Sequence, residues 1–203
     1  MIFFTSDTHF MHGKLLGNND FAPRPFKDVN EMNQTIINSW NEIVTDNDLV
    51  YHLGDVAVLM ANSGGNEAIF QILMQLNGRI TFIKGNHDNR SIINYIKKQN
   101  ILIKNKPKFE FHDVGILLKM NHHQLFLTHY PMMLGITNNS INLHGHIHHY
   151  SVNSETNINV GVDSPEVSYL ENQKKFGAPF AMAEIDVMIA GKKEALNNHD
   201  EVD

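Results

Sequence analysis

Short apolar runs alternate with amphipathic stretches in the first half of the chain. Three continuous apolar runs have the length of buried strands: residues 1–6, 49–53 and 79–83. Three further stretches repeat apolar residues every three or four positions, as on one face of a helix: residues 28–44, 66–76 and 91–98. This alternation predicts βαβ units around a parallel sheet.

Two residues refine the first predicted helix. Asp28 precedes the periodic stretch and is a candidate N-cap, and Trp40 lies on the apolar face and is expected in the core.

Two segments are expected to lack regular structure. The proline-containing segment before the first predicted helix, residues 10–27, is expected to be a loop beside the end of the first strand and a candidate wall for a substrate. Residues 62–65, Asn-Ser-Gly-Gly, predict a flexible connection.

The second half of the chain has shorter runs divided by turn residues, which indicates a meander or a mixed sheet. The predicted strands are residues 101–103, 108–112, 115–120, 124–127, 141–143 and 157–162. A helix is expected over 166–175, and residues 180–189 fit either a strand or a helix. We expect one domain over residues 1–190 and a frayed acidic tail over 191–203.

Composition narrows the class of protein. The 203 residues carry a net charge of −6, which argues against broad attraction to nucleic acid. There is no cysteine, which fits an intracellular protein, and no run approaches the roughly 20 apolar residues of a membrane span. We therefore expect a cytoplasmic protein without membrane attachment, and no obligate protein partner is evident.

Candidate ligands follow five of the predicted strands. The third strand leads directly into Gly85-Asn86-His87-Asp88, which combines an uncharged oxygen ligand, a proton carrier and a carboxylate. The full set of strand-end candidates is Asp7, His9, Asp55, Asn86, His87, His129, His146 and His148. Because ligands gather beyond the carboxyl ends of strands in open α/β sheets, these groups are expected in one crevice.

Oxygen and nitrogen ligands without sulfur suit Mn²⁺, Zn²⁺, Fe or related ions, and the seven candidates besides His87 exceed the needs of one tetrahedral site. Two metal ions are therefore the simplest explanation for this number of ligands. The alternating spacing of Asp7 and His9, and of His146 and His148, lets each pair point the same way in extended backbone.

Five motifs in this order resemble the calcineurin-like metallophosphoesterase superfamily: Asp7-x-His9, Gly54-Asp55, Gly85-Asn86-His87-Asp88, His129 before Tyr-Pro, and Gly145-His146-x-His148. The wider pattern is similar to small bacterial and phage phosphoesterases. The resemblance implies an α/β fold, an α/β/β/α sandwich of two mixed sheets flanked by helices.

The resemblance also implies the roles of these residues. Asp7, His9 and His148 would hold one divalent ion, Asn86, His129 and His146 the other, and Asp55 would bridge both. The ions would be Mn²⁺ first, with Zn²⁺, Fe or Ni²⁺ as alternatives, and would supply a hydroxide that attacks phosphorus. His87 would donate a proton to the leaving oxygen, and Asp88 would either fix its tautomer or cap the following helix.

Other polar residues have weaker signals. His12, Arg24 and Arg90 are candidates for substrate binding, with surface or supporting positions as alternatives. His52 is expected to pack in or under the sheet, His122 and His123 to be exposed in a turn, and His112 to lie on a strand surface. His144 and His149 flank the ligand pair, and Met132-Met133 is expected to pack or to form an apolar wall.

The expected function is hydrolysis of a phosphomonoester or phosphodiester by two metal ions, with a small substrate favoured. A nuclease or cyclic-nucleotide phosphodiesterase is the alternative among enzymes, so the substrate could include a nucleotide or nucleic acid. A non-catalytic scaffold is the alternative outside enzymes, although such scaffolds usually lose ligands and this chain keeps the whole set.

Overall fold

A five-stranded mixed sheet forms the centre of the molecule in the computed structural model, which describes residues 1–58, 65–135, 137 and 139–200. Its strands, in spatial order, are β11 (Phe180–Ala181), β1 (Ile2–Thr5), β2 (Leu49–His52), β3 (Arg79–Ile83) and β6 (Phe109–His112). β11 is antiparallel to β1, and the other neighbours are parallel. The parallel order of β1, β2 and β3 confirms the predicted βαβ pattern.

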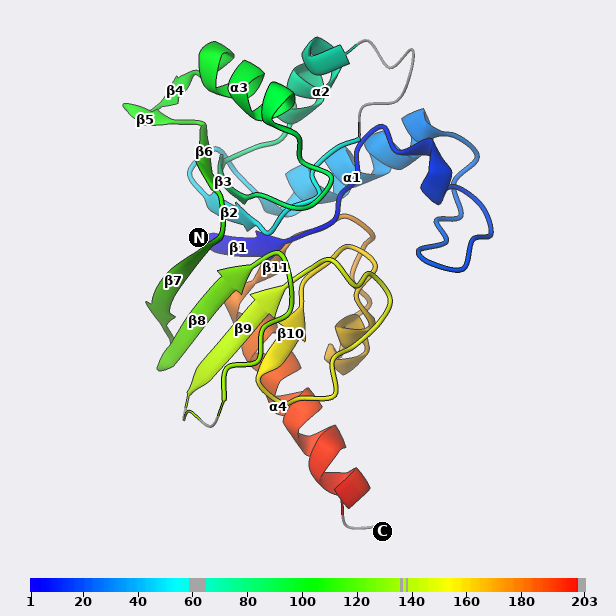
Figure 1. Cartoon of the computed structure of the whole chain (residues 1–203), viewed down its shortest axis with the longest axis vertical. Coiled ribbons are helices and arrows are strands. Elements are labelled where there is room, and N and C mark those ends of the chain that lie inside the picture. Colours follow the sequence, from blue (N-terminus) through cyan, green and yellow to red (C-terminus); the bar gives the residue numbers. More distant parts are fainter. Residues whose placement is uncertain (59–64, 136, 138, 201–203) are drawn as a thin grey trace.

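Three helices cover one side of this sheet: α1 (Val29–Ile43), α2 (Gly65–Met74) and α3 (Arg90–Gln99) (Figure 1). Asp28 caps α1 as predicted, because its side chain accepts a hydrogen bond from the Glu31 amide. Trp40 is fully buried in the cluster that these helices form with the sheet. Of the predicted flexible connection, residues 62–64 lie outside the described residues and Gly65 begins α2.

A second mixed sheet lies on the other side of the first (Figure 1). Its order is β10 (Asn157–Asn159), β9 (Ser140–His144), β8 (His123–Thr128) and β7 (Gly115–Met120). β7 and β8 form an antiparallel hairpin, whereas β8, β9 and β10 are parallel. A small ribbon joins β4 (Leu102–Ile103) to β5 (Lys106–Pro107). The expected α/β class with two mixed sheets is confirmed.

The two sheets share a second apolar cluster. Phe4 and Ile83 come from the first sheet, and Leu127 and Leu143 come from the second. Ile185 of α4 (Met182–Asp200) also packs into this cluster. Because both sheets bury residues in one cluster, the loops that follow their strands are held in fixed relative positions.

The helix expected over residues 166–175 is wrong. The structure has only a 3₁₀ turn, η2 (Pro165–Tyr169), which Ser164 caps through the Glu166 amide. Glu166 is buried and binds Lys192 of α4, with Glu166 Oε1 at 2.8 Å from Lys192 Nζ. This tertiary ion pair fixes the turn, and the sequence periodicity carried no sign of it.

The expected frayed tail also differs from the structure. α4 continues through Gly191 to Asp200, and the ambiguous stretch 180–189 divides into β11 and the start of this helix. Gly191 is needed for packing, because a β-carbon there would lie 2.9 Å from the Tyr169 ring. In the sequence Gly191 suggests the start of a tail, but in the structure it lies inside α4 and makes a close contact with Tyr169.

The segment 10–27 is largely irregular, as expected, apart from the 3₁₀ turn η1 (Gly13–Leu15). Within the described part of the chain, no helix has both the length and the apolar character needed to cross a membrane.

Candidate metal centre

The loops after β1, β2, β8 and β9 bring six of the strand-end candidates into two groups. In the first group, ligand atoms of Asp7, His9 and His148 all lie within 4.8 Å of one another. The same limit holds in the second group for ligand atoms of Asp55, His129 and His146. Groups of this composition and size can each hold one metal ion.

Asp55 lies between the two groups. Its Oδ2 is 3.5 Å from His9 Nε2 and 3.4 Å from His129 Nε2. Asn86 belongs to the second group, because its Oδ1 is 2.9 Å from His129 Nε2 and 2.9 Å from His146 Nδ1. One carboxylate shared between two clusters of ligands is the arrangement that a pair of neighbouring ions requires.

Two buried atoms of the first group have no hydrogen-bond partner, Asp7 Oδ1 and His9 Nε2. Burial raises the pKa of Asp7 to about 6 and lowers the pKa of His9 well below its usual value. An unpaired buried carboxylate is costly. A bound cation would compensate for the lost hydration of both atoms at once, so these residues fit a metal ion.

The backbone at the ligands is left-handed, which corrects the expectation of extended pairs. Five candidate ligands have positive φ: Asp7 (56°), His9 (49°), Asp55 (54°), His146 (72°) and His148 (49°). Non-glycine residues rarely adopt this conformation, and each instance costs of the order of 1–3 kcal/mol when the surroundings impose it. Side chains two residues apart therefore converge through tight turns, and strain is concentrated where the ligands gather.

Hydrogen bonds select which ring nitrogen faces the centre. His129 Nδ1 lies 2.8 Å from the Leu53 carbonyl oxygen, and His148 Nδ1 lies 2.8 Å from Asp163 Oδ2. An Nδ1–H that donates in this way leaves Nε2 free to bind a cation. The carboxylate of Asp163 thus orients His148.

The sequence interpretation missed Asp163. It follows β10 by a few residues, at the end of the stretch predicted as the last strand. The rule that found the other strand-end carboxylates would have found it there. In the structure the pKa of Asp163 is lowered: burial raises it, and hydrogen bonds and charge from His148 and Arg24 outweigh burial.

Arg24 does not face a substrate, which corrects its proposed role as a phosphate clamp. Its side chain is fully buried and binds Asp163 Oδ2 at 2.7 Å. The guanidinium also donates to the carbonyl oxygens of Asp7, at 2.6 Å, and Thr8, at 2.8 Å. Arg24 therefore supports the loop after β1, because its donors are used inside the protein.

Asp88 has neither of the roles considered for it. It is buried and accepts hydrogen bonds from the backbone amides of Gly85, Asp55 and Val56, at 2.8, 2.8 and 2.9 Å. Asn89, one residue later, caps α3 through the Ile92 amide. Asp88 joins the loops after β2 and β3.

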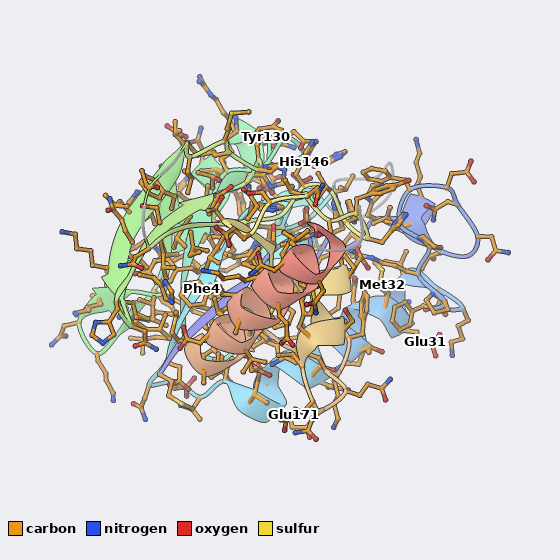
Figure 2. The ribbon with its side chains drawn as sticks, turned by 90° about the horizontal axis from the view of Figure 1, so that it is seen from below. Phe4, Glu31, Met32, Tyr130, His146 and Glu171 are labelled. Atoms are coloured by element: carbon orange, nitrogen blue, oxygen red, sulfur yellow. The ribbon has the colours of Figure 1, made fainter. Side chains whose placement is uncertain are left out.

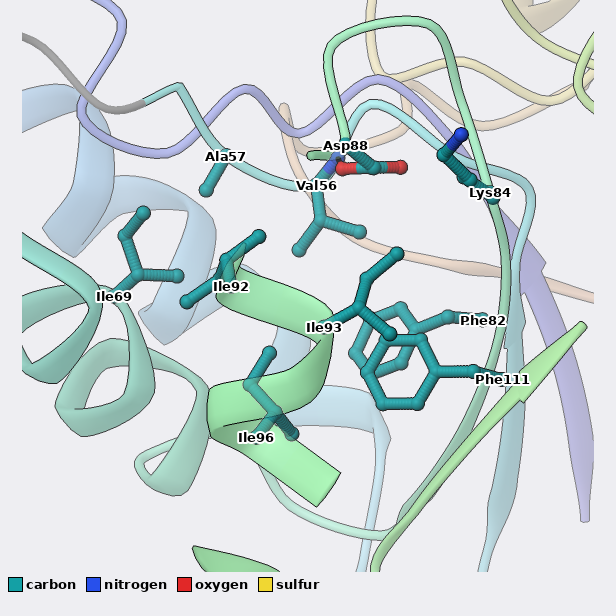
Figure 3. Close-up of a pocket in the computed structure, with 10 residues that line it drawn as sticks. All are labelled: Val56, Ala57, Ile69, Phe82, Lys84, Asp88, Ile92, Ile93, Ile96 and Phe111. Carbon is teal, nitrogen blue, oxygen red and sulfur yellow. Dashed lines mark hydrogen bonds between the residues drawn. The ribbon is translucent and has the colours of Figure 1, made fainter. Parts of the chain in front are cut away.

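Figure 3 shows Asp88 beside Val56 at one end of a small cavity of about 20 Å³, with Ile93 and Phe82 below. Most of the lining is apolar, so this cavity belongs to the core between α3 and the sheet. Its polar lining residues are Lys84 and Asp88, and Asp88 already accepts hydrogen bonds from three backbone amides, so the cavity does not fit a polar ligand.

His87 is exposed and belongs to neither metal group. Its ring centroid lies 5.2 Å from that of His9, and its backbone amide donates to Asp55 Oδ1 at 2.8 Å. The imidazole is therefore held at the site while its side chain remains accessible to a substrate.

Two glycines allow the loops to approach the carboxylates. A β-carbon on Gly85 would overlap the Asp55 side chain, and one on Gly145 would overlap Ser6 and the Asp7 carboxylate. Only glycine fits at such contacts. The Gly-Asn-His-Asp and Gly-His-x-His motifs need their glycines for this reason.

The remaining histidine and arginine candidates lie as follows. His12 is almost fully buried and its Nδ1 is 3.2 Å from His9 Nδ1, so it supports a ligand, one of the two roles considered for it. Arg90 is exposed at the start of α3. His144 is fully buried, whereas His149 is exposed.

Other positions agree with the sequence interpretation or refine it. His52 is buried, as expected, with its Nε2 at 2.9 Å from Thr8 Oγ1. His112 and His122 are exposed, as expected, whereas His123 is partly buried at the start of β8, which corrects its expected position in an exposed turn. Met133 is almost completely exposed.

Comparison with known proteins identifies the family. The model of the calcineurin-like phosphoesterase family matches residues 1–190. The chain belongs to this family. Together, the family and the two ligand clusters fit a metal-dependent phosphoesterase with a dinuclear site.

Two individual proteins are similar to this family member. Uncharacterized protein MJ1445 of Methanocaldococcus jannaschii is 36% identical over 137 residues, which cover 65% of this chain and 74% of that protein. The crystal structure of a protein of unknown function, AQ665 from Aquifex aeolicus, superposes with a TM-score of 0.62 and 23% identity. The match covers 92% of this chain and 97% of the other. The second similarity shows a shared fold.

Proposed function

We propose that this phosphoesterase hydrolyses a small phosphomonoester or phosphodiester with two divalent ions, Mn²⁺ being the favoured metal. The observation that carries the proposal is the position of Asp55, whose carboxylate lies within 3.5 Å of a histidine in each of the two ligand groups. When bound, two such ions would supply a nucleophilic hydroxide at neutral pH and positive charge beside the phosphate oxygens. The ligand set of oxygen and nitrogen also suits Zn²⁺, Fe and Ni²⁺.

The protein's own residues would divide the remaining work. Asp7, His9 and His148 would hold one ion, and Asn86, His129 and His146 would complete the second site with Asp55. His87 would donate a proton to the leaving oxygen, since its exposed ring lies beside His9 without joining either group. Arg90, exposed at the start of α3, remains a candidate for substrate contact.

The alternatives differ in the surface they require. A nuclease needs cationic surface along a nucleic acid strand, and the net charge of −6 disfavours that reading. A cyclic-nucleotide phosphodiesterase needs less surface and remains the nearer alternative. A non-catalytic scaffold is disfavoured by the presence of all seven ligand candidates.

A cytoplasmic location is our expectation from the cysteine-free sequence alone.

The direct test is a screen under Mn²⁺ with p-nitrophenyl phosphate, bis-p-nitrophenyl phosphate and single-stranded DNA. Activity on the first two substrates and little on DNA is the expected result. Dominant activity on DNA would favour the nuclease instead.

Asp55→Asn tests the metal centre itself. We expect this variant to lose bound metal, measured by elemental analysis, and to lose activity, because one ligand is shared by both sites. Asp113→Asn, in an exposed turn, is the matched control and should keep both properties. Full turnover by Asp55→Asn would refute the proposed centre.

A further inference from the structure

Two half-exposed aromatic rings stand beside the ligand histidines, one at each group. The residue Phe21 is 49% exposed, and its ring centroid lies 4.6 Å from that of His148, at an interplanar angle of 64°. The residue Tyr130 is 52% exposed, and its ring centroid lies 4.5 Å from that of His146, at 62°. Figure 2 shows Tyr130 and His146 next to each other. Each ring therefore has an edge-to-face contact with a ligand histidine and leaves much of its surface open.

The loop that carries Phe21 is internally ordered. The Asn19 side chain accepts hydrogen bonds from the amides of Phe21 and Ala22, at 3.1 and 2.7 Å. It also donates to the carbonyl oxygen of Leu15, at 3.2 Å. Ala22, the next residue, is buried. A fixed turn thus presents Phe21 outward while its neighbour is anchored in the protein.

Tyr130 is positioned in a comparable way from the second sheet. Its carbonyl oxygen accepts a hydrogen bond from Thr128 Oγ1 at 2.7 Å, and its ring also contacts the His129 ring with centroids 5.0 Å apart. Leaving two aromatic rings half exposed in fixed positions forgoes the stabilisation of burying them. Rings held in this way are ready to stack on a planar partner without a further ordering cost.

We infer that Phe21 and Tyr130 are specificity residues that stack on an aromatic group of the substrate, either a nucleobase or an aryl ring attached to the phosphate ester. The inference rests on the proposed function, because it names the substrate class of the same site. Recognition by neutral rings does not require a cationic surface, which fits the net charge of −6. Base–aromatic stacking changes affinity by about 5- to 150-fold per contact.

Binding to the Mn²⁺-loaded protein tests the inference without turnover when the ligands are phosphonates, whose carbon–phosphorus bond is not hydrolysed. Calorimetry would compare the 5′-phosphonate analogue of thymidine 5′-monophosphate, phenylphosphonate and methylphosphonate, which share the phosphonate and differ in the attached group. We expect at least one aromatic ligand to bind about 5- to 150-fold more tightly than methylphosphonate. Tighter binding of the thymidine ligand would identify a nucleotide, and tighter binding of phenylphosphonate an aryl ester.

Variants then assign the preference to the rings. Phe21→Leu and Tyr130→Leu should each lower the ratio of aromatic to methyl affinity, and Phe21→Tyr and Tyr130→Phe should retain it. Tyr150→Leu is the matched control, since this half-exposed ring contacts His149, which belongs to neither metal group. A ring that only supported its histidine would lower the affinity for all three ligands equally and leave the ratio unchanged.

In turnover, thymidine 5′-p-nitrophenyl phosphate and methyl p-nitrophenyl phosphate have a common aryl leaving group, so the ratio of their kcat/KM values tests recognition of the nucleobase alone. Equal affinities for aromatic and methyl ligands, or an unchanged ratio in both leucine variants, would overturn the inference even if both esters are hydrolysed. Preferential binding of the aromatic ligands with no hydrolysis by the unmodified protein would overturn the proposed function, and the stacking of an aromatic group on the two rings would stand as a binding property of the site.

Discussion

At the residue scale, His9 and His87 lie beside each other in opposite environments. His9 is 1% exposed, and its unpaired Nε2 faces two carboxylates. His87 is exposed, with its ring outside both ligand groups. Burial next to carboxylates suits a metal ligand, whereas exposure beside the centre suits a group that exchanges protons with a substrate.

His87→Ala should therefore slow turnover without removing metal. We expect a fall in kcat of about 10²- to 10⁴-fold for esters with poor leaving groups, because these need a proton most, and a smaller fall for p-nitrophenolate. Steady-state kinetics and elemental analysis of the purified variant measure the two properties. His112→Ala, at an exposed residue that ends β6 and belongs to neither ligand group, is the control. Loss of metal from His87→Ala would contradict this division of roles.

At the element scale, the turn between β7 and β8 sets the register of these two strands. The β7–β8 hairpin closes with Asn121 and His122, whose φ angles are 46° and 64°. Two central residues with positive φ define a type I′ turn, which matches the twist of paired strands and favours glycine at its second position. This hairpin leads through β8 to His129, so its register positions a ligand candidate.

His122→Gly should stabilise the protein. His122 is exposed, and its left-handed backbone conformation destabilises the folded state, whereas glycine adopts this conformation without strain. We therefore expect the free energy of unfolding to rise by about 0.5–1 kcal/mol. Urea denaturation measures the difference. His112→Gly is the opposite control, because it places glycine in β6 and should lower stability by about the same amount. A His122→Gly variant less stable than the original would show that this side chain has a stabilising contact.

At the scale of the whole molecule, packing and buried polar contacts compensate for the backbone strain at the ligand residues. Two apolar clusters hold the sheets and helices, and the ligand loops are connected between them by buried polar contacts such as Asp88 to Asp55 and Arg24 to Asp163. Without cations, the centre places Asp7 and Asp55 near each other in a buried region. Ions that bind only the folded state would therefore stabilise the whole structure.

Removal of metal should lower the melting temperature. An ion at about 1,000 times its dissociation constant adds about 4 kcal/mol per site, so two sites add about 8 kcal/mol. One kcal/mol shifts Tm by roughly 2–4 °C in a chain of this length, so EDTA should lower Tm by about 20 °C. Differential scanning calorimetry with and without EDTA checks this. Asp55→Asn should show little response to EDTA. An equal Tm for the original protein in both conditions would argue against bound ions.

The sequence by itself determined most of the element order and the set of candidate ligands. Buried strands and amphipathic helices have local signatures, and ligands at strand ends appear as polar residues directly after apolar runs, so Asp7, Asp55 and His129 could be identified without coordinates. The glycines of the motifs were also visible, although the carboxylates that require them were not.

Only the tertiary structure decided what the supporting residues do. Arg24 and Asp163 are 139 positions apart, and Asp88 contacts the loop after β2 from the loop after β3. Contacts over such separations depend on how the sheets pack, which local periodicity does not report. The extension of α4 past Gly191 depends likewise on the Tyr169 ring and on the ion pair of Lys192 with Glu166. Local pattern therefore identified the candidate ligands, and packing between distant segments assigned the residues that orient them.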